Sequence, residues 1–283
     1  MYKLTPDKDI NCKKIKIPRR DGKMMPALIL SPKDKDTGGR APGVLWIHGG
    51  GYIVGMKEMV HMSRAVDLVK RYGAVVISPG YRLAFTAPYP AAVEDCYDAL
   101  LYLKAHADFL GVNRAQIMVG GESAGGGLCA AVCMMARDRG DVNIAYQMPL
   151  YPMLDNLDTE SSADNHGRAW NTKKNHLAWR IYLRENAKAT VSPYATPARQ
   201  TDYTGLPPAY TFVGVGEPFY TETCAYIDNL RKAGVEAEID IYETDMHAFD
   251  MLSPDEKLSK MAAQRFNERF EYAIGHYFAQ NYG

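Results

Sequence analysis

Short apolar runs alternate with amphipathic segments along most of the chain. The runs are typical of strands buried in a sheet, and segments with apolar residues every three or four positions are typical of helices packed on one face. From these patterns we expect an edge strand at residues 13–20, further strands at 25–30, 43–47, 74–79, 116–120, 143–150, 209–215 and 237–242, and helices at 58–72, 90–106, 127–137, 221–233 and 254–278.

This alternation of strands and helices predicts an α/β fold, with a mostly parallel sheet covered by helices on both faces. In such a sheet the functional groups gather at the carboxyl ends of the strands. One segment, about residues 155–190, breaks the alternation: it is polar, yet it carries Trp170, Trp179 and Tyr182. We expect it to fold as a small cap of helices over that edge of a single domain spanning residues 1–283, together with a short N-terminal segment of about residues 1–23.

Composition and charge narrow the classes of protein. The 283 residues include 33 Lys plus Arg and 33 Asp plus Glu, so the formal net charge is zero. With this balance the chain has no excess of positive charge that would favour binding to nucleic acid or electrostatic attachment to a membrane. The sequence has no apolar run long enough to span a membrane and no signal-peptide core at its start, so we expect a cytoplasmic protein.

The five cysteines are better explained as core thiols than as ligands or disulfides. They form no C-x-x-C pair, their number is odd, and Cys96, Cys129 and Cys133 lie in apolar helical patterns. Small buried thiols of this kind behave as apolar side chains. We therefore expect no metal site built on cysteine.

The stretch Gly121-Glu122-Ser123-Ala124-Gly125-Gly126 follows a predicted strand and precedes a predicted helix. A serine between two glycines at such a corner is the G-x-S-x-G nucleophile elbow, in which the glycines allow a tight turn. The hydroxyl of Ser123 would then stand at the positive end of the helix. The plainer interpretation is a glycine-rich turn capped by a serine; the flanking strand and helix favour the nucleophile.

A serine nucleophile needs a general base and an acid that orients it. Among the seven histidines, His247 is the candidate, because it directly follows the last predicted strand and completes a Ser, acid, His order. Glu217, which follows the preceding strand, is the predicted acid. Glu222 is the competitor, one helical turn later, where the alternative role is a favourable charge at a helix start. Asp245 and Asp250 stand too near His247 in sequence for an easy geometry.

The tetrahedral oxyanion of acyl transfer needs hydrogen-bond donors. The stretch His48-Gly49-Gly50-Gly51 lies at the end of another predicted strand, where backbone N–H groups of glycines are accessible. We expect the amides of Gly50, Gly51 and Ala124 to form the oxyanion hole. His48 itself is interpreted as a structural hydrogen-bonding residue. A phosphate cradle is the alternative for the glycine run, but no Lys-Ser/Thr pair follows it as a P-loop requires.

With these residues laid out, the chain resembles the hormone-sensitive-lipase-like family of α/β-hydrolase esterases. The matching stretches lie in the family's order over most of the chain: residues 48–52, 81–84, 90–95, 121–126, 192–193 and 247–249. The chain departs from the family's pattern in having Glu217 where Asp is usual, and in Phe85-Thr86-Ala87 where Pro-Glu-His is common.

The resemblance implies an eight-stranded sheet, a helical cap, no metal or organic cofactor, and hydrolysis of short-chain carboxylic esters through an acyl-enzyme. Deacetylation of sugars or other small polar esters is an alternative, as is a peptidase or amidase activity on the same triad. A non-catalytic ligand-binding protein on the same fold is the alternative from another class. The expected partner is a small-molecule ester. Family members often pair through strand or helix edges, so a homodimer is also open.

Overall fold

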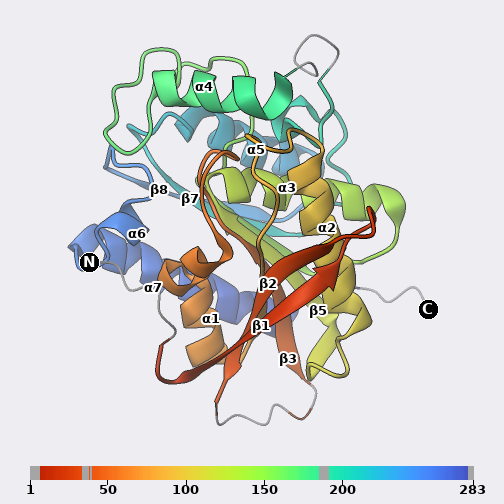
Figure 1. Cartoon of the computed structure of the whole chain (residues 1–283). Coiled ribbons are helices and arrows are strands. Elements are labelled where there is room, and N and C mark those ends of the chain that lie inside the picture. The colour runs from red at the N-terminus through yellow and green to blue at the C-terminus, as the bar shows by residue number, and fades with distance from the viewer. Residues whose placement is uncertain (1–6, 34–37, 39, 185–190, 280–283) are drawn as a thin grey trace.

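The computed structural model describes residues 7–33, 38, 40–184 and 191–279 (Figure 1). Helices and strands alternate along the chain after an N-terminal pair of strands. In chain order they are β1 (Ile10–Pro18), β2 (Met24–Pro32), β3 (Ala41–Ile47), η1 (Lys57–Met62), α1 (Ala65–Tyr72), β4 (Val75–Pro79), α2 (Ala91–Ala105), β5 (Val112–Glu122), α3 (Ala124–Arg139), β6 (Tyr146–Leu150), α4 (Thr172–Leu183), η3 (Pro197–Arg199), β7 (Ala209–Gly214), α5 (Tyr220–Lys232), β8 (Ala237–Tyr242), α6 (Phe249–Leu252) and α7 (Lys257–His276).

The strands form one eight-stranded sheet in the order β1-β2-β4-β3-β5-β6-β7-β8. β4 to β8 and β3 run parallel to one another, whereas β2 is antiparallel to β4 and β1 is antiparallel to β2. This confirms the predicted α/β fold with a mostly parallel sheet of eight strands.

Two apolar cores lie on opposite faces of the sheet because successive side chains of a strand point to opposite sides. In β3, Leu45 and Ile47 pack with α2 and α3, while Val44 and Trp46 pack with α1 and α7. β3, β4 and β6 are buried at every position, as strands covered on both faces must be. This packing accounts for the unbroken apolar runs in the sequence.

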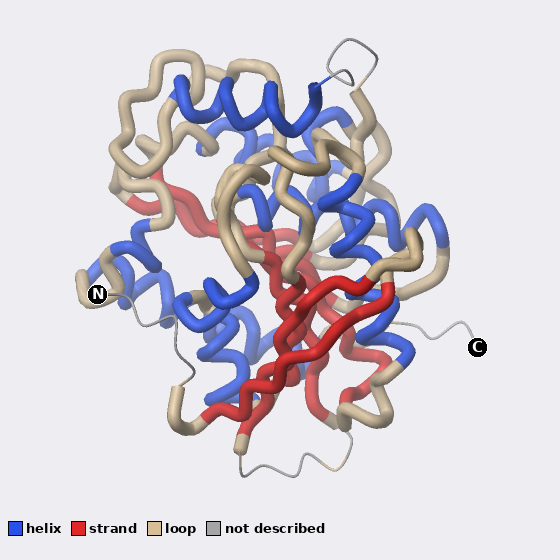
Figure 2. Tube along the Cα trace, in the orientation of Figure 1, coloured by secondary structure: helices blue, strands red, loops and turns tan. Residues whose placement is uncertain are grey.

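Three local expectations were wrong. The helix expected at 58–72 is split into η1 and α1, because the Ser63 hydroxyl accepts a hydrogen bond from the amide of Ala65 at 3.1 Å and starts a new helix. The sequence pattern did not predict α6, a single short helical turn after His247. In the described part of the cap segment, α4 is the regular helix, and turns and loops make up the rest (Figure 2).

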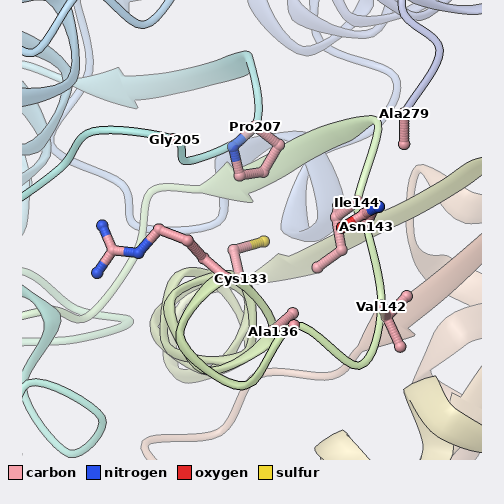
Figure 3. A pocket seen from close by; sticks show the side chains of 10 residues that line it. Cys133, Ala136, Val142, Asn143, Ile144, Gly205, Pro207 and Ala279 are labelled. Atoms are coloured by element: carbon pink, nitrogen blue, oxygen red, sulfur yellow. The ribbon is translucent and has the colours of Figure 1, made fainter. Parts of the chain in front are cut away.

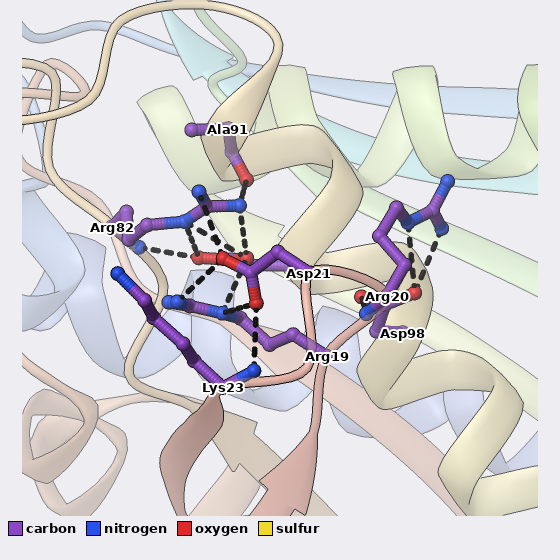
Figure 4. A network of polar contacts seen from close by, with 8 residues as sticks. Arg19, Arg20, Asp21, Lys23, Arg82, Ala91 and Asp98 are labelled. Atoms are coloured by element: carbon purple, nitrogen blue, oxygen red, sulfur yellow. Dashed lines mark hydrogen bonds and ion pairs between the residues drawn. The ribbon is translucent and has the colours of Figure 1, made fainter.

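The N-terminal hairpin lies at the sheet edge: residues 10–18 form β1 and pair with β2 along its whole length. Its turn is held to α2 by ion pairs (Figure 4). Asp95, fully buried, accepts two short hydrogen bonds from Arg82, and Arg20 pairs with Asp98 at 2.7 Å. This polar network fixes the loop after β4, where Ala84 bonds to the carbonyl of Tyr52 at 2.9 Å.

Candidate active site

Ser123 lies at the corner between β5 and α3, as the sequence predicts for a nucleophile elbow. Its φ of 56° is positive, a conformation that costs energy for a residue with a side chain. The two flanking glycines explain how the corner closes. A Cβ at Gly125 would lie 2.1 Å from the carbonyl oxygen of Ile47, and one at Gly121 would lie 2.5 Å from the carbonyl oxygen of Gly125. The corner therefore cannot form with larger residues at these positions.

The structure brings His247 to Ser123 across 124 positions of sequence. The His247 Nε2 atom lies 2.9 Å from the Ser123 Oγ atom, and both side chains are buried, with 5% and 6% of their residues' surface exposed. Tyr151 and Phe219 flank the imidazole, with ring centroids 5.1 Å and 5.0 Å away and nearly perpendicular planes. The ring can thus accept the serine proton without leaving its place.

Glu217 is the acid that meets the histidine. Its Oε2 atom lies 2.5 Å from His247 Nδ1, and its Oε1 atom accepts the Gly214 amide at 2.7 Å. Burial raises the pKa of Glu217, while the bonds to His247 and to the Gly214 amide act in the opposite direction. The carboxylate therefore fixes the tautomer with the proton on Nδ1 and leaves Nε2 free to accept from Ser123.

The competing acids are engaged elsewhere. Glu222 accepts the amide of Leu154 at 2.6 Å, and burial raises its pKa well above the usual range, so it serves the backbone after β6. Asp250 accepts the hydroxyl of Tyr151 at 2.8 Å and pairs with Arg64 at 3.2 Å. The structure therefore distinguishes Glu217, which contacts His247, from Glu222 and Asp250, which bond to other partners. The spacing of these residues in the sequence could only favour one of them.

The glycine loop after β3 lies against the nucleophile. A Cβ at Gly49 would lie 3.2 Å from that of Ser123, so the two backbones are in contact. Gly50 and Gly51 have φ values of 115° and 59°, which glycine adopts at no steric cost. In the parts of the chain that the structure describes, the amides of Gly50 and Gly51 donate no hydrogen bond to the protein. They are available as donors in a loop that contacts Ser123 through Gly49.

His48 shapes this loop rather than joining Ser123. Its Nδ1 atom donates to the carbonyl of Gly49 at 2.8 Å, and its ring stacks on Tyr81 at 4.2 Å. Burial lowers the pKa of His48 to about 4, so the ring is neutral near pH 7.

Two aromatic neighbours of His247 were missed by sequence reasoning, and so was the contact between an aromatic residue of the cap and the glycine loop. Tyr151 follows β6 with a positive φ of 33°, and its only sequence signal is its place at a strand end. Phe219 immediately precedes α5, as its N-cap residue. Trp170, in the cap, contacts Gly51: a Cβ on that glycine would lie 2.3 Å from the indole ring. No local sequence pattern predicts such contacts between residues that lie far apart in the chain.

A cavity of about 520 Å³ lies elsewhere, near the end of α3 that is remote from Ser123 (Figure 3). Mostly apolar side chains, together with Arg137 and Asn143, line it, and it includes none of the predicted site residues. Among the residues that the structure describes, no group of three His, Cys, Asp or Glu side chains is arranged to hold a metal ion, and the five cysteines are free thiols. Nor does any helix in the described ranges have the length and apolarity needed to cross a membrane.

A serine at a nucleophile elbow, bonded to a histidine that is bonded in turn to a buried carboxylate, defines the class of α/β-hydrolase-type proteins. Comparison with known proteins agrees. The family model described as alpha/beta hydrolase fold matches residues 44–251. The chain belongs to this family, within its group of hormone-sensitive-lipase-like carboxylic ester hydrolases.

Individual relatives are similar over most of this chain. An AB hydrolase superfamily protein of Schizosaccharomyces pombe is 33% identical over 82% of this chain and 71% of its own length. Esterase LipI of Mycobacterium tuberculosis is 33% identical over 74% of this chain and 66% of its own length, just under two thirds. Among solved structures, a bacterial heroin esterase superimposes with a TM-score of 0.89 and 34% identity, covering 94% of this chain and 85% of that one.

Proposed function

We propose that this protein is a serine carboxylesterase that hydrolyses short-chain acyl esters through an acyl-enzyme. The observation that carries the proposal is the chain of contacts from Ser123 Oγ to His247 Nε2, at 2.9 Å, and from His247 Nδ1 to Glu217, at 2.5 Å. The esterase names of LipI and of the heroin esterase support the same reaction class.

In the proposed reaction His247 takes the proton of Ser123 as its Oγ attacks the ester carbonyl carbon. The negative charge that forms on the carbonyl oxygen is stabilised by the amides of Gly50, Gly51 and Ala124. His247 then gives its proton to the departing alcohol, and the C–O bond to that alcohol breaks. A water molecule, deprotonated by His247, attacks the acyl-serine, and collapse of the second intermediate releases the carboxylic acid and restores Ser123.

Glu217 acts on the histidine rather than on the ester. It stabilises the imidazolium formed in each half-reaction and keeps the proton on Nδ1 when the ring is neutral. The Gly214 amide holds the carboxylate from its other oxygen, so that it faces the imidazole. Glu217, which stands where the family usually has aspartate, bonds the Gly214 amide with one oxygen and His247 with the other, so the longer side chain still reaches the imidazole.

The test is hydrolysis of p-nitrophenyl butyrate by the wild type and by Ser123→Ala. We expect the variant to lose activity by about 10⁴-fold or more, leaving only what binding and the amide donors supply. Labelling of the wild type, but not of the variant, by a fluorophosphonate would identify Ser123 as the nucleophile. Turnover by the variant near the wild-type rate would overturn the proposal, and a wild type that neither turns over esters nor reacts with the probe would favour a ligand-binding protein.

A further inference from the structure

The imidazole of His247 makes two hydrogen bonds, donating from Nδ1 to Glu217 and accepting at Nε2 from Ser123. Both bonds lie in the plane of the ring, because the N–H and the lone pair of an imidazole point outward in that plane. The two bonds therefore leave the ring free to tilt about the line that joins the two nitrogens. Packing restricts this tilt, since the rings of Tyr151 and Phe219 lie nearly perpendicular to the imidazole.

The backbone around His247 is held mainly on its C-terminal side. Residues 243–246, which precede the histidine, are exposed or partly buried. After it, Ala248 has a positive φ of 58°, and α6 begins with Phe249 and Asp250, both buried. A residue with a side chain keeps this left-handed conformation only where its surroundings hold it there. The position of the histidine thus depends on what anchors α6.

Asp250 ties α6 to two other parts of the fold. Its carboxyl group is fully buried, with Oδ1 accepting the hydroxyl of Tyr151 at 2.8 Å and Oδ2 3.2 Å from Nε of Arg64. Arg64 directly precedes α1 and also pairs with Asp67 at 2.9 Å. Tyr151 follows β6, and its amide donates to the carbonyl of Phe212 in β7 at 3.1 Å. One carboxylate therefore joins the histidine loop both to the sheet and to the start of α1.

We infer that Tyr151 and Asp250 are positioning residues for His247: the carboxyl group fixes the tyrosine ring, and the fixed ring keeps the imidazole aligned with the nucleophile. This inference rests on the proposed esterase function and adds two residues to the support of its general base. The effect falls on the chemical steps, because a base that tilts away from the serine hydroxyl takes its proton less readily. Binding of the ester does not require this alignment.

The chain contains a second group of the same residue types, which provides a matched control. The hydroxyl of Tyr210, in β7, donates to Asp240 at 2.8 Å, and Nε of Arg265 lies 3.3 Å from the same carboxyl group. Tyr210 is also buried, and its ring packs against Phe212 and Phe266 in the apolar core. Removing either tyrosine hydroxyl breaks one hydrogen bond to an aspartate. The first ring borders the general base, however, whereas the second lies in the core.

The experiment compares Tyr151→Phe with Tyr210→Phe. We expect Tyr151→Phe to lower kcat for p-nitrophenyl butyrate about tenfold and to change KM by less than about twofold, because both half-reactions depend on the imidazole. The rate of labelling by a fluorophosphonate should fall by a similar factor. Tyr210→Phe should change neither rate by more than about twofold. Urea unfolding should show a similar loss of stability in the two variants, since each loses one hydrogen bond.

A double variant tests whether the two residues act through one contact. Asp250→Ala removes the acceptor of the tyrosine hydroxyl, while Arg64 keeps its ion pair with Asp67. If both residues act by fixing the same ring, the kcat of Tyr151→Phe/Asp250→Ala should equal that of Asp250→Ala within about twofold. A loss equal to the product of the two single losses would contradict the inference. Should Asp250→Ala not fold, Asp250→Leu removes the same acceptor and fills the space.

The proton spectrum adds a readout that does not depend on ester turnover. The proton on Nδ1 of His247, bonded to Glu217, should give a low-field resonance in the wild type. We expect this resonance to broaden or shift in Tyr151→Phe and to stay unchanged in Tyr210→Phe. Equal effects of the two variants on kcat and on the resonance would overturn the inference. A wild type that shows the resonance but neither ester turnover nor labelling would instead reject the proposed function, so the two failures are distinguishable.

Discussion

Buried carboxyl groups lie in two regions of the molecule, at the contact between α2 and the turn of the β1–β2 hairpin and at the candidate site, and the two sets have different partners. At the hairpin, Asp95 accepts a hydrogen bond from the guanidinium of Arg82 at 2.7 Å, with the Nε atom of Arg19 3.8 Å away. At the site, Glu217 faces an imidazole, and the neighbouring Glu122 accepts an indole N–H from Trp46 at 2.7 Å. A carboxylate with an arginine is a fixed ion pair; one with a histidine can share in proton transfer.

In the first region the ion pairs hold the fold together, whereas in the second a proton must move during the reaction. In the first region, removing a partner should cost stability and leave the chemistry of the folded protein intact. In the second, removing the carboxylate that faces the imidazole, Glu217, should cost turnover and leave the fold intact. The four changes below test this division, from the largest expected effect to the smallest.

Glu217→Gln should lower kcat by about 10⁴-fold, because an amide can no longer stabilise the imidazolium and can favour the wrong tautomer. The measurement is kcat for p-nitrophenyl butyrate at pH 8, with circular dichroism to show that the fold is kept. Glu222→Gln is the matched control. Glu222 is buried with a raised pKa and accepts the Leu154 amide, so a neutral amide oxygen can replace it with little effect on kcat. The opposite ranking of the two variants would assign the acid to Glu222.

Arg82→Ala should lower the free energy of unfolding by about 2–4 kcal/mol, because it leaves Asp95 buried without its main partner. The value is below that for a wholly buried pair, since 27% of the Arg82 side chain is exposed. Urea unfolding at pH 7 measures the loss. The variant that remains folded should keep the wild-type KM and kcat at 15 °C. A fall in kcat with unchanged stability would contradict the division between the two regions.

Glu122→Gln should change how stability depends on pH. Burial raises the pKa of Glu122 from 4.5 to about 8, so between these values the folded protein holds a proton that the unfolded chain releases. The free energy of unfolding of the wild type therefore falls as pH rises through this window, by up to about 1 kcal/mol per pH unit from this group. In Glu122→Gln the side-chain amide does not titrate, and its oxygen can still accept the hydrogen bond from the Trp46 N–H.

Urea unfolding at half-unit steps from pH 5 to 9 tests this. We expect the difference between Glu122→Gln and the wild type to grow in favour of the variant as pH rises toward 8 and then to level off. Parallel curves for the two proteins would show that Glu122 does not hold a proton in the folded state.

Arg20→Ala should have the smallest effect, a loss of about 1 kcal/mol or less in the free energy of unfolding. The Arg20 side chain is 35% exposed, and Asp98 keeps the Arg20 backbone amide as a donor at 3.0 Å after the side chain is removed. Thermal unfolding of Arg20→Ala, of Arg82→Ala and of the wild type under the same conditions measures this loss of stability. A loss of stability equal to that of Arg82→Ala would show that the contribution of these ion pairs does not depend on their exposure to solvent.

Much of this fold could be predicted from sequence because strand burial leaves a strong local signal. β3, β4 and β6 are apolar at nearly every position, and the elbow glycines 121 and 125 are dictated by contacts within a few residues of Ser123 or with one neighbouring strand. The break at Ser63 and the short α6 were missed because single side-chain hydrogen bonds and one turn of helix leave no periodicity to detect.

The sequence by itself determined the sheet, the position of the serine at a strand end, and a short list of bases and acids at the same edge. Only the tertiary structure placed Glu217 against His247 and Glu222 against the Leu154 amide, placed Tyr151 and Phe219 around the imidazole, and set Trp170 on Gly51. The reason is physical: strand burial is recorded locally in the pattern of apolar residues, whereas the meeting of loops from four strands depends on sheet order, on twist and on side-chain packing over 124 positions of chain.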